Sequence, residues 1–117
     1  MKKKSRTQLK KQADKLFSLI VRSRGSCERC ATTRNLQCAH IQSRTNLHLR
    51  WDEKNALCLC VRCHLYWAHK NPLEFATWYV ALYPKENAYL MKEKNVIEPN
   101  MDYEVVIERL NKRLDKV

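Results

Sequence analysis

The chain has 117 residues and a formal net charge of +11, with 23 lysines and arginines against 12 acidic residues. This length suits one domain with a modest core, and a single glycine with three prolines argues against a fibrous or disordered chain. No apolar run approaches the roughly 20 residues that span a bilayer, and no apolar stretch of a signal peptide follows the N-terminal lysines. We therefore expect a cytoplasmic protein that contacts no membrane.

The positive charge is unevenly distributed along the chain. Residues 1–24 carry +8 and residues 25–70 carry +4, whereas residues 71–95 are balanced and residues 96–117 carry −1. Positive charge concentrated in one part of a small protein favours a polyanionic partner, and nucleic acid is the simplest one. The alternative is a basic surface that only faces solvent.

The first expected element is a basic amphipathic helix from Ser5 to about Ser23, ended by Gly25. Its apolar positions follow helical spacing: Leu9, Ala13, Leu16, Phe17 and Ile20. Lys10 and Lys11 lie off this stripe, so their face of the helix is a candidate for contact with phosphates. The stripe itself is expected to form core.

Short strands and further helices are expected after residue 26. The strands are residues 36–41, a segment beginning at 49–51, and residues 56–59. The helices are residues 61–70, 72–83, 85–94 and 101–116. Asn71 and Pro72 provide an N-cap and a first helical residue for the second of these helices. The expected fold class is therefore α+β and mainly helical.

Two CxxC pairs stand about thirty residues apart. Cys27 and Cys30 form the first pair, and Cys60 and Cys63 form the second. Each CxxC turn places two sulfur atoms on one side of an ion, so two turns complete the tetrahedral shell of a structural zinc. A reducing cytoplasm also favours metal ligation over disulfides. The other two cysteines, Cys38 and Cys58, are expected to be buried strand residues.

The residues between the two pairs form a further pattern. Asn55 precedes Cys60 by five residues, His64 directly follows Cys63, and His40 lies fifteen residues before Asn55. Over about residues 26–70 this pattern resembles the HNH endonucleases, whose fold is a ββα-metal finger around one catalytic divalent ion. The resemblance implies a domain of residues 1–117 with three parts: a basic helix (1–25), a zinc and HNH core (26–70) and C-terminal helices (71–117).

The resemblance also implies a role for each residue of the pattern. His40 corresponds to the general base that takes a proton from the attacking water, a role that suits an imidazole near neutral pH. Asn55 corresponds to the residue that holds the loop bearing the base. His64 corresponds to a ligand of the catalytic ion, which is Mg²⁺, Mn²⁺ or another divalent ion and stabilises the leaving 3′ oxygen.

One position departs from the family. Members usually carry His or Asp directly before the base, as a second ligand of the catalytic ion, and this chain has Ala39 there. Mg²⁺ prefers oxygen ligands, so His64 alone would hold it poorly. Asp52 is the first candidate for the missing ligand, with His48 and Cys38 as weaker alternatives. Asp52 also suits a purely structural role as a turn or capping residue.

The function implied is hydrolysis of phosphodiester bonds in double-stranded DNA, by nicking or by cutting both strands. Arg44 and Arg50, in the region after His40, are candidates for gripping phosphates. Compact HNH proteins of this kind resemble those of bacteriophage, which suggests packaging or recombination partners and the host cytoplasm. Two alternatives stay open: a non-catalytic, zinc-stabilised nucleic-acid-binding module, which Ala39 favours, and a protein-interaction adaptor that uses the C-terminal helices.

Overall fold

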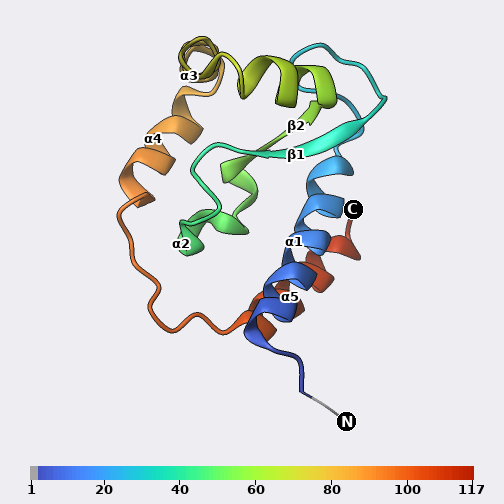
Figure 1. Cartoon of the computed structure of the whole chain (residues 1–117), viewed down its shortest axis with the longest axis vertical. Helices are drawn as coiled ribbons and strands as arrows, with labels where there is room; N and C mark the ends of the chain where they lie inside the picture. Colours follow the sequence, from blue (N-terminus) through green and yellow to red (C-terminus); the bar gives the residue numbers. More distant parts are fainter. Residues whose placement is uncertain (1–2) are drawn as a thin grey trace.

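The computed structural model describes residues 3–117, which form helices around one small sheet (Figure 1). The elements in chain order are α1 (Arg6–Arg22), β1 (Leu36–His40), α2 (Leu47–Arg50), η1 (Glu53–Asn55), β2 (Ala56–Cys60), η2 (Arg62–Ala68), α3 (Pro72–Leu82), α4 (Pro84–Glu93) and α5 (Tyr103–Leu114). Here η1 is a 3₁₀ turn and η2 is a π-helix. The protein is thus mainly helical, as expected. Within residues 3–117 no helix combines the length and the apolar character needed to cross a bilayer.

The sheet consists of β1 and β2 alone, paired antiparallel. Leu36 lies opposite Cys60 and His40 lies opposite Ala56. Figure 1 shows the sheet between α1, below it in the view, and the helical segment that follows β2, above it. Because successive side chains of a strand point to opposite faces, neighbouring residues of β1 face different helices.

Helix α1 begins and packs as its sequence predicts. The Ser5 side chain accepts a hydrogen bond from the Gln8 amide, and the Gln8 side chain accepts one from the Ser5 amide, which completes a capping box. The apolar stripe is buried or partly buried against α5 and one face of the sheet. This contact between the two ends of the chain gives the protein one of its two apolar cores.

The second core lies on the other face of the sheet. It joins Ala39 and Leu57 of the strands to Tyr79 of α3 and Leu90 of α4, and it includes three of the CxxC cysteines. The segments that carry the CxxC pairs and the helices α3 and α4 therefore share one packed interior.

The prediction of a strand beginning at Leu49 is wrong. Residues Leu47–Arg50 form the short helix α2. The side chain of Asn46 caps its start by accepting a hydrogen bond from the Leu49 amide at 3.2 Å, and it also donates to the Lys94 carbonyl at 2.8 Å. Because that second partner lies in a distant part of the chain, the local apolar pattern around Leu49 does not reveal it.

The helix expected at residues 61–70 is present, with a π-helical register. Its marker is the hydrogen bond from the His69 amide to the His64 carbonyl, five residues back, at 3.0 Å. Pro72 occupies the start of α3 as predicted, but Asn71 makes no side-chain cap. Its side-chain amide instead donates to the Trp67 carbonyl at 3.1 Å and closes the end of η2.

Candidate metal centre and neighbouring histidines

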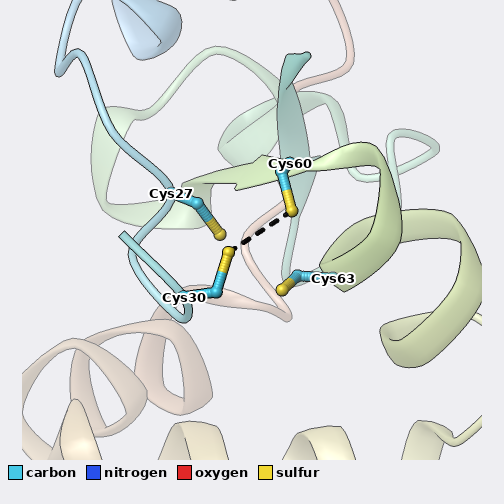
Figure 2. Close-up of side chains that lie close together, drawn as sticks. All are labelled: Cys27, Cys30, Cys60 and Cys63. Carbon is cyan, nitrogen blue, oxygen red and sulfur yellow. Dashed lines mark hydrogen bonds between the residues drawn. The ribbon is translucent and has the colours of Figure 1, made fainter. Parts of the chain in front are cut away.

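The sulfur atoms of the four CxxC cysteines converge from two separate segments of the chain (Figure 2). All four Sγ atoms lie within 4.8 Å of one another, and those of Cys30 and Cys60 are 3.6 Å apart. Zinc–sulfur bonds of about 2.3 Å in a tetrahedron place the sulfur atoms about 3.8 Å apart. The cluster of Cys27, Cys30, Cys60 and Cys63 therefore fits a structural metal ion such as zinc, as its spacing predicts.

Backbone hydrogen bonds shape the first CxxC turn and attach it to the sheet. Ala31 has a φ of 67°, and its amide donates to the Cys27 carbonyl at 2.9 Å while the Cys27 amide donates to Thr32. The Glu28 amide donates to the Cys58 carbonyl at 2.8 Å, and the Glu28 carboxylate accepts from the Cys58 amide at 2.6 Å. The first turn is thus bonded to the outer edge of β2, the strand that ends at the second CxxC turn.

Two thiols of the cluster have pKa values shifted in opposite directions. Burial opposes ionisation of Cys27, but backbone amides of the cluster donate to its sulfur and lower its pKa to about 6. Burial raises the pKa of Cys63 to about 12, and the adjoining sulfur atoms add to this effect. The Arg29 guanidinium donates to the Cys63 sulfur at 3.5 Å and stacks on the Trp67 ring at 3.6 Å. A divalent cation would offset half of the negative charge of four thiolates here.

The remaining cysteines stay apart from this cluster. Cys38 and Cys58 lie opposite each other in the sheet and contact the core beneath α1. Burial raises the pKa of Cys38 to about 12 and also raises the pKa of Cys58. Cys58 is buried as expected, whereas Cys38 is only partly buried and lines the cleft beside α1.

Asn55 is fully buried and connects the segments on either side of it in space. Its Oδ1 accepts from the Gln42 amide at 2.7 Å. Its Nδ2 donates to the carbonyls of Gln42 and Leu49, at 3.2 and 3.1 Å. Its own carbonyl accepts from the Ile41 amide at 3.0 Å. The segment that directly follows His40 is thus held by the side chain and the backbone carbonyl of Asn55.

His40, the predicted general base, lies on the α1 face of the sheet. Its Nε2 is 2.8 Å from the Arg50 carbonyl, and its ring centroid is 5.6 Å from that of Phe17. Burial lowers its pKa below the usual value near 6.5; Arg44 and Arg50 add repulsion, which the Arg50 carbonyl and Asp14 oppose. The ring is therefore neutral at physiological pH and has a fixed orientation.

His64 approaches β1 from the opposite face. Its Nδ1 is 2.8 Å from Oε1 of Gln37, and its ring is 4.5 Å from that of His69, edge to face. Burial lowers the pKa of His64 to about 4, and the charges of His69 and His40 add to this effect. His40 thus lies on the α1 face of β1, whereas His64 contacts β1 from the opposite face.

A cleft of about 370 Å³ runs along β1 beside α1. Its lining combines residues of both elements and of the following loop: Asp14, Ser18, Arg22, Leu36, Gln37, Cys38, His40 and Arg44. Gln37 belongs to this cleft and also bonds His64. The cleft therefore contains His40 and two arginines, and Gln37 links its lining to His64.

The predicted phosphate-binding arginines are both paired with Asp14 of α1. Arg50 contacts both carboxylate oxygens, at 3.0 and 2.7 Å, and its side chain is only 12% exposed. Arg44 is 57% exposed and contacts one oxygen at 2.6 Å. Trp51 Nε1 donates to the same carboxylate at 2.9 Å. Arg50 is thus a structural residue as much as a binding candidate, whereas Arg44 is accessible.

The lysines predicted to contact DNA differ in exposure. Lys11 is exposed, while Lys10 is half-buried with its amine 6.0 Å from the centre of the Tyr103 ring of α5. Lys10 therefore lies along the contact between α1 and α5, and Lys11 is free to meet a partner.

The structure does not bring Asp52 to His64. One Asp52 oxygen accepts from the Lys54 amide at 2.9 Å and caps η1, and the other accepts from the Tyr89 hydroxyl. His48 contacts Glu98 at 2.9 Å. Among residues 3–117, the four cysteines are the only cluster of three or more metal-binding side chains. Asp52 thus has the capping role that the sequence left open, and Ala39 is buried in the second core.

Two residues at the site were missed from the sequence. Gln37 orients His64, and strand alternation can place its side chain on the face opposite His40 but does not identify its partner. His69 lies beside His64 only because of the π-helical register. No sequence signal marks that register.

Comparison with known proteins adds no relative. No family model matches the chain, and no curated protein or solved structure is significantly similar to it. The resemblance to HNH endonucleases therefore depends on the residues of this chain alone and remains a prediction.

Replacing Cys60 with serine tests the metal centre. We expect zinc to fall from about one ion per chain to nearly none, with loss of the folded state, since binding and folding are coupled in such sites. Metal analysis and circular dichroism of the purified protein measure both effects. The matched control is Cys38→Ala, which should keep its zinc; equal zinc in the Cys60→Ser variant would contradict the assignment.

Replacing Asn55 with alanine tests the buried amide. The change leaves the Gln42 amide and the Leu49 carbonyl unpaired, so the free energy of unfolding should fall by about 3 kcal/mol. Urea denaturation of the metal-loaded protein measures this. Asn111→Ala, on the exposed face of α5, should change it by less than about 0.5 kcal/mol. Similar values for the two variants would show that Asn55 is not a structural tie.

Proposed function

We propose that this protein is a metal-dependent endonuclease that hydrolyses phosphodiester bonds of double-stranded DNA, with His40 as the general base. The observation that carries the proposal is the placement of His40. A neutral imidazole, held by the Arg50 carbonyl, borders a cleft that contains Arg22 and Arg44. A base of this kind suits the activation of water beside a bound phosphate.

The surroundings of His40 favour catalysis over a purely structural role. Asn55 holds the segment after His40 by three side-chain hydrogen bonds, which limits movement of the base relative to the cleft. The order of β1, β2 and η2 along the chain is that of a ββα finger, and His64 stands in the first turn of η2. The cysteine cluster joins the end of β2 to this turn, so a structural ion would hold base and metal ligand in register.

Charge supports DNA as the substrate. The net charge of +11 is concentrated in residues 1–70, and Arg44 and Lys11 are accessible beside the cleft and on α1. Contacts of arginine and lysine with phosphates position a duplex without reading its bases. We therefore propose weak sequence preference and binding that weakens steeply as salt increases.

A second candidate is a zinc-stabilised nucleic-acid-binding module without catalytic activity. Two observations favour it: Ala39 offers no ligand for a catalytic ion, and both oxygens of Asp52 have other partners. This module would bind DNA in a salt-dependent manner and leave it intact in every divalent metal.

The first test uses supercoiled plasmid. With Mg²⁺, Mn²⁺ or Ni²⁺, the zinc-loaded protein should give relaxed or linear DNA, and His40→Ala should lower the rate by at least about 100-fold because the base is lost. Gel electrophoresis measures the products. His48→Ala, which removes a histidine outside the cleft, should cut at nearly the parent rate.

The outcomes separate the candidates. Equal cutting by the parent and His40→Ala would remove His40 from the mechanism. Salt-dependent binding without cutting in any metal would favour the non-catalytic module.

The pH dependence of cleavage tests the state of His40. Its neutral form is the active one, and burial lowers its pKa below the usual value near 6.5, so any rise of the rate with pH should have its midpoint below pH 6.5. Initial rates at low DNA concentration, from pH 5 to 8, measure this. A midpoint above 6.5 would contradict the proposed base.

A further inference from the structure

Ala39 offers no second ligand for a catalytic ion, but two histidines lie side by side at η2. We propose that His64 and His69 form an open, two-imidazole site for a transition-metal ion, separate from the cysteine cluster. The assignment of this ion as the catalytic one rests on the proposed nuclease function, whereas the binding of the ion does not.

The π-helix creates the pairing of the two histidines. In an α-helix, residues five apart lie about 140° apart around the axis, so their side chains point away from each other. Here the bond from the His69 amide to the His64 carbonyl widens the turn, and the two ring centroids are 4.5 Å apart at an interplanar angle of 76°. A histidine at a helix end commonly only complements the helix dipole. The helix dipole does not explain why a second imidazole, that of His64, contacts the His69 ring.

Gln37 prepares His64 for metal binding. Its Oε1 lies 2.8 Å from Nδ1 of His64, so Nδ1 carries the proton and Nε2 keeps a free lone pair. Histidine ligands of metal ions generally have such a partner, which sets the tautomer and the ring orientation. Gln37 also lines the cleft beside His40, so one side chain contacts both the cleft and His64.

The exposure of the two histidines and the lack of a third protein ligand indicate an open site. His69 is exposed and His64 is half-buried, so an ion can enter from solvent. No carboxylate or thiol within residues 3–117 completes a three-residue cluster with them. The remaining positions of the ion would therefore hold water or a phosphate oxygen, as at metal sites that act on a substrate.

Ligand type determines which ions the site would accept. Imidazole suits Fe²⁺, Ni²⁺, Cu²⁺ and Zn²⁺, and the affinity of such a site increases from Mn²⁺ to Ni²⁺. Mg²⁺ requires oxygen ligands and should bind poorly. The site therefore predicts activity with transition metals at concentrations where Mg²⁺ gives little.

Calorimetric titration of the zinc-loaded protein with Ni²⁺ tests the site directly. The parent should bind one further equivalent, and His69→Gln should weaken this binding by at least about tenfold while the cysteine-bound zinc stays in place. His48→Gln is the matched control and should bind Ni²⁺ as the parent does. Gln37→Leu should weaken binding by about tenfold by releasing the tautomer of His64. Equal Ni²⁺ affinity in the parent and His69→Gln, or equal weakening in His48→Gln, would overturn the proposal.

A cleavage assay with Mn²⁺ separates this inference from the proposed function. His69→Gln should cut more slowly than the parent, and excess Mn²⁺ should restore part of the rate. Ni²⁺ binding that depends on His69, without cleavage by the parent, would support the metal site and contradict the nuclease. Cleavage by the parent, with Ni²⁺ binding unchanged in His69→Gln, would support the nuclease and contradict the metal site.

Discussion

Four sulfur atoms from two chain segments meet within 4.8 Å, and this meeting joins the end of β2 to the helix that carries His64. The first CxxC turn is bonded to the outer edge of β2, and the second leads directly from β2 into η2. A metal ion among these sulfur atoms would thus fix the angle between sheet and helix.

The two faces of β1 carry different polar groups. On the α1 face, His40 borders a cleft with arginines, and Asp14 holds Arg50 in place by two hydrogen bonds. On the η2 face, His64 is oriented by Gln37. A pair of buried or half-buried polar side chains, Asp14 and Asn55, therefore organises the basic segment that follows β1, in a region where excess positive charge would otherwise repel itself.

Much of the fold is readable from local patterns. Ser5 and the apolar stripe predicted α1, Pro72 predicted the start of α3, and the CxxC spacing predicted the cysteine cluster. These signals involve residues within one or two turns of each other, or a spacing that itself encodes the geometry of an ion. They hold because capping, amphipathic burial and metal coordination each require particular residue types at fixed distances along the chain.

The sequence by itself determined most local elements and which cysteines cluster, whereas the tertiary structure decided which polar groups meet. Asp14 bonds Arg50 across 36 residues, and this changes a predicted phosphate ligand into a largely structural one. Asn46 bonds the Lys94 carbonyl, and a helix stands where a strand was expected. The His69 ring contacts the His64 ring because the helical turn between them has the π register, with one residue more than an α-helical turn. Such outcomes depend on distant partners and small differences in backbone register, which no nearby residue specifies.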